Sequence, residues 1–114
     1  MMLYRHPKKP DLRSLLMLYA IICEEMPGAL EKRLANRPAH VARLKQLQAD
    51  GRLILAGPHP MIDAEDPGTA GFSGSLIVAE FASREAAIAW ASEDPYCSAG
   101  VFASVSVKPF KRVF

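Results

Sequence analysis

The clearest alternation of apolar and polar positions lies near the end of the chain, over residues 101–107. One side of this segment carries small or β-branched residues, namely Val101, Ala103, Val105 and Val107. The other side carries Phe102, followed by polar residues. Because side chains alternate across a strand, this period of two predicts a β-strand over residues 101–107.

Three further segments are short, apolar and bounded by residues typical of turns. Residues 16–24 form an apolar run that ends just before Pro27 and Gly28. Residues 52–57 end at a glycine, and residues 72–81 lie between a glycine and a serine. Each segment therefore predicts a β-strand.

The segment between the first two strands has apolar residues at helical spacing, interrupted by Pro38. Proline disrupts a helix interior but is accepted in the first turn. We therefore expect a short helical turn through Leu34, followed by a main helix that opens at Pro38. Gly51 is well placed to end that helix.

A second helix is predicted after the third strand. Ser83 is a typical N-cap, and alanines with Trp90 provide an apolar face. The helix is expected to stop at Asp94, because the residue before a proline disfavours helical geometry. Residues 57–71 contain too many prolines, glycines and aspartates for regular structure, so they predict a long loop of the kind that often carries function.

The resulting order, β-α-β-β-α-β, predicts an α+β fold of the ferredoxin-like type, with both helices on one face of an antiparallel sheet. On this interpretation Ile77, Phe81 and Phe102 lie on the face away from the helices. An apolar sheet face of this size usually marks an interface. We therefore expect a homodimer formed through the open sheet face.

The N-terminal part of the chain requires separate treatment. Residues 15–23 are apolar and follow a basic stretch, which resembles a secretory signal, but no typical cleavage site follows. The run is also too short to cross a bilayer, which needs about 20 apolar residues. We predict a flexible N-terminal extension over residues 1–16 and one domain over residues 17–114.

Charge and cysteine content narrow the classes of partner. The formal net charge is +2, and residues 1–16 contribute +3 of it through four basic side chains against one aspartate, so the body carries −1. Such a body lacks the basic face typical of a nucleic-acid reader. The two cysteines, Cys23 and Cys97, have no metal-ligand spacing and suit a reducing compartment. We expect a cytoplasmic protein with no nucleic-acid or membrane partner.

The candidate chemistry begins with His40. A helical projection places it on the same apolar side as Val41, Leu44 and Leu47. This position fits either a core histidine hydrogen-bonded to the backbone or a general base. Asp94 follows Trp90 by one helical turn and could reach the same region, where a carboxylate would fix the tautomer of an imidazole.

Three further residues are candidate substrate contacts. Arg37, next to the expected helix start, could hold an anion or simply extend into water. His59 lies in the expected loop, and Tyr96 follows the end of the second helix. No spacing supports a metal site, so no metal or other cofactor is predicted.

The sequence resembles the YciI-like (YCII-related) domain family. The motifs RPAH, AGP, GSLIVAEF, DPY and VKPF fall in the family's order over residues 17–114. The resemblance implies a dimeric α+β barrel of ferredoxin-like subunits. It also implies a His-Asp dyad, which corresponds here to His40 and Asp94.

Three functional hypotheses follow from these residues and this resemblance. The first is a small acid-base enzyme of the lyase or isomerase type, acting on a small cyclic or quinol-like compound with His40 and Asp94 as its dyad. The second is a module that binds a small ligand or a partner without catalysis. The third is a cofactor-free monooxygenase of the same fold. The fold by itself does not choose among them.

Overall fold

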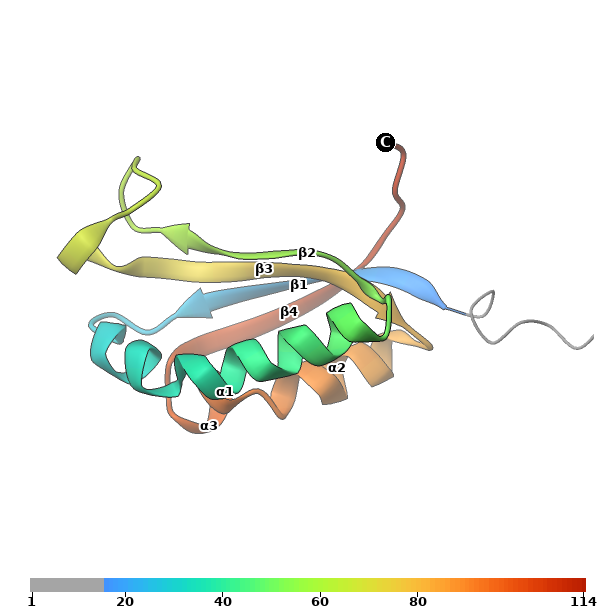
Figure 1. The fold of residues 1–114 in the computed structure, drawn as a ribbon, viewed down its shortest axis with the longest axis horizontal. Helices are drawn as coiled ribbons and strands as arrows, with labels where there is room; N and C mark the ends of the chain where they lie inside the picture. The colour runs from blue at the N-terminus through green and yellow to red at the C-terminus, as the bar shows by residue number, and fades with distance from the viewer. Residues whose placement is uncertain (1–15) are drawn as a thin grey trace, which may run out of the picture.

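The computed structural model describes residues 16–114 (Figure 1). Residues 1–15, most of the predicted N-terminal extension, lie outside the described residues. The elements follow in the order β1 (Met17–Glu25), α1 (Leu30–Ala49), β2 (Leu53–Pro60), a short 3-10 helix (Gly68–Ala70), β3 (Phe72–Phe81), α2 (Arg84–Ser92), α3 (Pro95–Ser98) and β4 (Phe102–Phe110).

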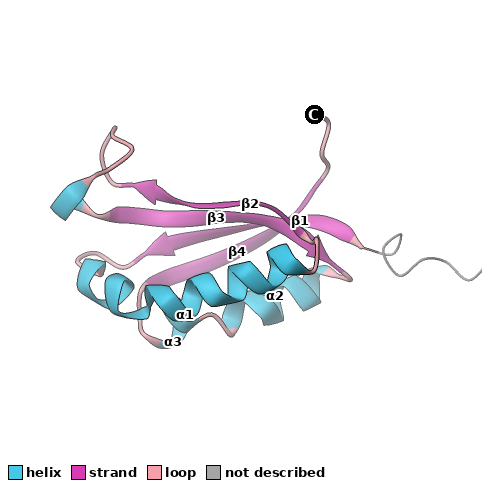
Figure 2. Ribbon diagram, in the orientation of Figure 1, coloured by secondary structure: helices cyan, strands magenta, loops and turns pink. Residues whose placement is uncertain are grey.

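The four strands form one sheet with the order β2-β3-β1-β4, and every neighbouring pair is antiparallel. The helices cover one face of this sheet (Figure 2). This arrangement confirms the predicted α+β, ferredoxin-like subunit. It places α1 and α2 side by side, so residues on their inward sides can meet over the sheet.

The core lies between the sheet and the helices. Its buried members are Tyr19, Ile21, Cys23, Leu47, Ile77, Ala79, Phe81, Ala87, Ala91 and Val107. The assignment of Ile77 and Phe81 to the open face was therefore wrong, because both pack beneath the helices. The error arose because β3 is apolar at most positions on both faces, so its sequence pattern does not determine which face is covered.

Phe102 was also assigned to the wrong face, for a different reason. The pairing of β1 with β4 shifts at Glu24, which lies opposite Ser104, whereas Glu25 lies opposite Phe102. This β-bulge turns Phe102 toward the helices, where its ring meets Tyr96 edge-on with the ring centroids 5.4 Å apart. A bulge of this kind cannot be recognised from the regular alternation of the strand.

The open face of the sheet nevertheless carries apolar residues, other than those expected, beside the polar Glu80, Ser106 and Lys108. The strand register places these apolar side chains opposite the core set; they are Leu18, Ala20, Ile22, Leu55, Leu76, Val78 and Phe110. Leu55 and Phe110 are exposed, and Val78 is buried by its neighbours. We call these seven residues the open-face patch.

Helix α1 is continuous through Pro38, so the predicted break before this residue was wrong. Proline removes one N–H and thereby frees the carbonyl of Leu34, four residues earlier. The Leu34 side chain is 58% exposed and Pro38 is also exposed. The freed carbonyl therefore lies on the side of the helix that water can reach, and burial of the other side keeps the helix intact.

Other boundaries are close to those predicted, with one consequence. The Ser83 side chain accepts a hydrogen bond from the Ala86 backbone N–H at 3.0 Å and caps α2 as expected. Strand β2, however, extends to Pro60, so His59 lies in a strand, opposite Gly74, and not in a loop.

Within residues 16–114, no helix is long and apolar enough to cross a membrane.

We predict that Gly74→Ala destabilises the fold while Gly57→Ala does not. A Cβ at residue 74 would collide with the Cys23 carbonyl oxygen of the adjacent strand, whereas a Cβ at residue 57 meets nothing within 4 Å. Overpacking of this kind typically costs about 1–3 kcal/mol. Urea unfolding followed by circular dichroism measures both variants, and equal stabilities would contradict the described β1–β3 register.

Candidate active site

The buried stripe of α1 carries unusual residues. Arg33, His40 and Leu47 are its buried members, spaced seven residues apart, so they lie two helical turns from one another on one side. His40 is only 6% exposed. The structure thus confirms that this imidazole faces inward, as its position in the sequence predicts.

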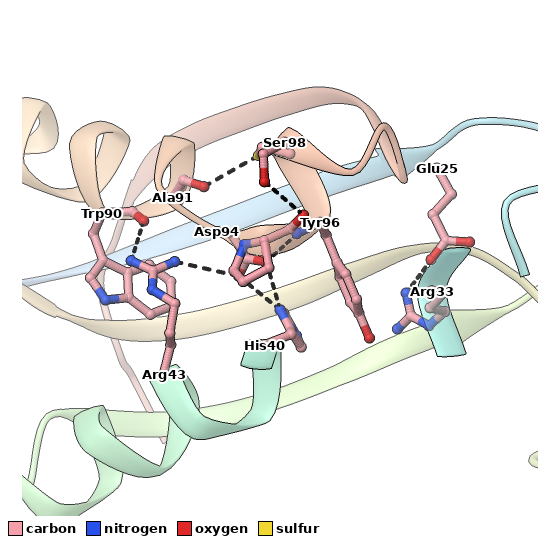
Figure 3. A network of polar contacts seen from close by, with 11 residues as sticks. Glu25, Arg33, His40, Arg43, Trp90, Ala91, Asp94, Tyr96 and Ser98 are labelled. Atoms are coloured by element: carbon pink, nitrogen blue, oxygen red, sulfur yellow. Dashed lines mark hydrogen bonds and ion pairs between the residues drawn. The ribbon is translucent and has the colours of Figure 1, made fainter. Parts of the chain in front are cut away.

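His40 and Asp94 are in direct contact (Figure 3). The His40 Nδ1 atom lies 2.7 Å from one carboxylate oxygen of Asp94 and 2.9 Å from the other. Both side chains are buried, although they are 54 residues apart in the sequence. With Nδ1 engaged by a carboxylate, the Nε2 atom of His40 is the nitrogen available for proton exchange.

The position of Asp94 is fixed by its role at the start of α3. Its Oδ1 atom accepts a hydrogen bond from the Tyr96 backbone N–H at 2.9 Å, and Pro95 occupies the first helical turn. Arg43 adds a third contact, with its Nη1 atom 3.5 Å from Asp94 Oδ2. The buried carboxylate thus has partners from the helix, from the imidazole and from a cation, which offsets much of the cost of its burial.

Arg43 is itself held by α2. Its Nη2 atom donates a hydrogen bond to the Trp90 carbonyl oxygen at 2.6 Å, and its guanidinium lies over the Trp90 ring at 4.3 Å from the centroid. The sequence pattern did not single out Arg43, because its contact with Asp94 joins residues far apart in the chain. Arg43 therefore acts as a positioning residue for the carboxylate.

The orientation of the imidazole is set by aromatic rings. The rings of His40 and Tyr96 are stacked, with centroids 4.1 Å apart and an interplanar angle of 12°. Phe102 meets His40 edge-on at 6.5 Å. Since Tyr96 directly follows the Asp94-Pro95 pair, the short α3 segment positions both the carboxylate and the ring that stacks on His40.

A cavity of about 430 Å³ opens beside the dyad. Its lining residues come from α1, β2, β3, α3 and the loop after β2. They are Leu30, Arg33, Leu34, Arg37, His40, Val41, Leu44, Ala56, Gly57, Pro58, Asp66, Gly68, Phe72, Ser75, Ile77 and Tyr96. The lining combines an apolar surface with a few polar groups, which is typical of a small-molecule site.

Arg33 is a site residue that the sequence interpretation missed. Its side chain is buried, pairs with Glu25 through Nη1 and Oε1, and lies over the rings of Phe72 and Tyr96 at 4.7 and 4.9 Å from their centroids. Burial raises the pKa of the Glu25 carboxyl, and the adjacent guanidinium opposes that rise. The sequence contained a signal for Arg33. It precedes His40 by seven residues, or two helical turns, and therefore lies on the same side of the helix.

The other expected substrate contacts have different outcomes. Arg37 and Tyr96 both line the cavity. His59 is exposed on β2 and is not among the lining residues, although its neighbour Pro58 is. Because successive side chains of a strand point to opposite faces, the extension of β2 directs His59 away from the dyad.

The cysteines near the site are not suited to act as nucleophiles. Burial raises the pKa of the Cys23 thiol to about 12 and also raises the pKa of Cys97. Both thiols are free. Within residues 16–114, no group of three or more His, Cys, Asp or Glu side chains is placed to share a metal ion.

Comparison with known proteins identifies the family. Residues 17–111 match the model of the YCII-related domain. The chain belongs to this family. It is 59% identical to Protein YciI of Escherichia coli and 57% identical to an uncharacterised protein of Haemophilus influenzae, in each case over 98 residues that span 86% of this chain and all of the relative.

A solved structure with the same fold is that of TftG, the 5-chloro-2-hydroxyhydroquinone dehydrochlorinase of Burkholderia phenoliruptrix AC1100, in complex with 2,5-dihydroxybenzoquinone. It is 29% identical to this chain, with a TM-score of 0.72. The match covers 83% of this chain and 94% of TftG. This YCII-related protein therefore shares its fold with an enzyme that acts on a quinol-like compound.

We predict that neutral His40 carries its proton on Nδ1, because both Asp94 oxygens accept there. Asp94→Ala should shift the population toward the Nε2-protonated tautomer, which imidazoles favour in water. Nitrogen-15 NMR of the ring distinguishes the two tautomers. An Nε2-protonated ring in the unmodified protein would contradict the described contact.

Proposed function

We propose that this YCII-related protein is a small acid-base enzyme of the lyase or isomerase type. The observation that carries the proposal is the His40–Asp94 contact, with His40 in the wall of a cavity. A carboxylate at one imidazole nitrogen orients the ring and stabilises the imidazolium that forms when the other nitrogen takes a proton. Purely structural histidines do not require a cavity beside them.

In the proposed reaction, His40 Nε2 accepts a proton from the substrate. Asp94 remains ionised and stabilises the positive charge that develops on the ring. Arg43 holds Asp94 in place through its ion pair, and Tyr96 keeps the imidazole plane fixed by stacking. The same imidazolium can return the proton to a leaving group or to another position of the substrate, which covers both elimination and isomerisation.

The substrate proposed is a small cyclic or quinol-like compound. A cavity of about 430 Å³ lies at the small end of the range for ligand sites and suits a single substituted ring. The apolar lining would contact the ring faces, while Arg37 offers a positive charge for an acidic oxygen. The activity named for TftG is of this class, which supports the same choice here.

We expect His40→Ala to lower the rate of chloride release from 5-chloro-2-hydroxyhydroquinone by about 10²–10⁴, the range that general-base catalysis supplies. Asp94→Asn should also lower the rate, because an amide cannot neutralise the imidazolium. Chloride release, corrected for the uncatalysed reaction, measures both effects. His59→Ala is a matched control, since this histidine does not line the cavity.

Two results would contradict the proposal. Full activity in His40→Ala would show that the reaction does not need this imidazole. An unmodified protein that binds 2,5-dihydroxybenzoquinone without any turnover of the chlorinated quinol would favour the alternative of a non-catalytic ligand-binding module.

We further propose that two copies associate through the open-face patch. Ala20 of β1 lies opposite Val78 of β3, and Ile22 lies opposite Leu76, so apolar side chains adjoin across these two central strands. Apolar patches of this kind are seldom left in water. The free thiols of Cys23 and Cys97 suit a reducing compartment, and we propose the cytoplasm as the place of action.

Light scattering should give a mass of twice 12.5 kDa, and Ile22→Asp should give a monomer, because it places a charge at the centre of the patch. The expected interface buries more than about 1,000 Å² in total. Ile88→Asp, at an exposed position on α2, is the matched control and should leave the dimer intact. A stable monomer at micromolar concentration would contradict this proposal.

A further inference from the structure

The hydroxyl of Tyr96 is a buried polar group without a partner in the part of the chain that the structure describes. Tyr96 is 0% exposed, and its Oη atom makes no hydrogen bond to any group within residues 16–114. A buried hydroxyl that lacks a partner costs about 1–3 kcal/mol. Proteins keep an unpaired buried polar group where a ligand supplies the missing partner. The Tyr96 hydroxyl therefore calls for a functional explanation.

The position of the hydroxyl supports such a role. Tyr96 lines the cavity beside the dyad, and its ring extends from α3 between His40 and Arg33 (Figure 3). Burial raises the pKa of the phenol, so Oη keeps its proton at neutral pH and acts as a hydrogen-bond donor. A ligand oxygen beside Oη would therefore be an acceptor.

Arg33 adds positive charge at the same end of the cavity. Its guanidinium is held by the rings of Phe72 and Tyr96 and by Glu25, whose Oε1 atom contacts Nη1. A guanidinium has five N–H donors, and Arg33 itself lines the cavity. Arg33 is thus fixed in place with donor capacity left for a ligand.

We propose that Tyr96 Oη and Arg33 form an oxyanion subsite, and that the substrates are acidic enols or phenols that carry a second oxygen within reach of this pair. This inference rests on the proposed acid-base function and specifies its substrate class. His40 removes the proton from one oxygen of the substrate. The subsite, whose Tyr96 ring stacks on His40, receives the negative charge at a second oxygen.

The proton and charge balance is simple. The proton of a substrate hydroxyl moves to His40 Nε2, and the electron pair of the broken O–H bond stays on the substrate. In a conjugated ring that charge spreads to a second oxygen, which becomes a stronger acceptor for the Tyr96 hydroxyl and the Arg33 guanidinium. These interactions therefore strengthen as the charge develops, which is the requirement for catalysis by electrostatic stabilisation.

The test measures binding with no turnover. The probe is 2,5-dihydroxybenzoquinone, which is anionic at neutral pH, and its matched neutral counterpart is hydroquinone. By isothermal titration calorimetry, Tyr96→Phe should weaken binding of the anionic probe about tenfold or more, because a charge-assisted hydrogen bond is lost. Binding of hydroquinone should change much less.

Tyr19→Phe is the matched control. Tyr19 is a second buried tyrosine that does not line the cavity, so removal of its hydroxyl should leave the affinity for both probes unchanged. For Arg33, the double variant Arg33→Met with Glu25→Gln avoids an unpaired buried carboxylate. It should also weaken binding of the anionic probe selectively.

Stability gives a second measurement that distinguishes a ligand-binding hydroxyl from a structural one. Because Oη has no partner among residues 16–114, Tyr96→Phe should keep or raise the melting temperature. A clear loss of stability would show that the hydroxyl serves the fold and would overturn the proposal.

The proposal also fails if the unmodified protein does not bind the anionic probe, or if Tyr96→Phe binds it as tightly as the unmodified protein. Either result leaves the role of the dyad to the chloride-release measurement with His40→Ala. Conversely, chloride release could prove independent of His40 while binding of the anionic probe still depends on Tyr96. That result would support the subsite and reject the proposed enzyme. The two proposals can therefore fail separately.

Discussion

The buried carboxylate of Asp94 is the constraint on which the site depends. It lies where α2 ends and α3 begins, and it contacts His40 of α1 and the backbone of α3. Loss of the partners of a buried charge costs on the order of 3–5 kcal/mol, so these elements cannot easily move apart. The contact that orients the imidazole therefore also fixes the packing of the helices around it.

Some polar groups of the site hold the dyad in place, and others are available to a ligand. Asp94 is satisfied from three directions, and Arg43 is held by Trp90 through both stacking and a hydrogen bond. The Tyr96 hydroxyl, by contrast, has no partner within residues 16–114. The carboxylate and the guanidinium that position the imidazole are thus held by several contacts, while the Tyr96 hydroxyl beside the imidazole keeps its donor capacity. Such a division is expected where rigid support and ligand recognition are built from neighbouring residues.

The two faces of the sheet have different roles in the proposed dimeric enzyme. The covered face supports the helices and forms the cavity floor through Ser75 and Ile77. The open-face patch is apolar over the central strands and is proposed to hold a second copy. Because adjacent residues of one strand face opposite sides, substitutions one residue apart, such as at Ile21 and Ile22, should affect different properties.

Much of the fold and part of the candidate site could be predicted from the sequence alone. Local patterns predicted the element order and the Ser83 cap, helical spacing placed His40 inward, and family resemblance paired it with Asp94. The tertiary structure decided between arrangements that the local sequence pattern allows equally. Both alternate sets of β3 are apolar, so only packing placed Ile77 and Phe81 under the helices. Only pairing with β1 produced the bulge that turns Phe102 inward, and only burial of one side kept α1 continuous at Pro38. The partners of Arg33 come from three other elements, two of them distant in the sequence, and contacts of that kind depend on the folded chain as a whole.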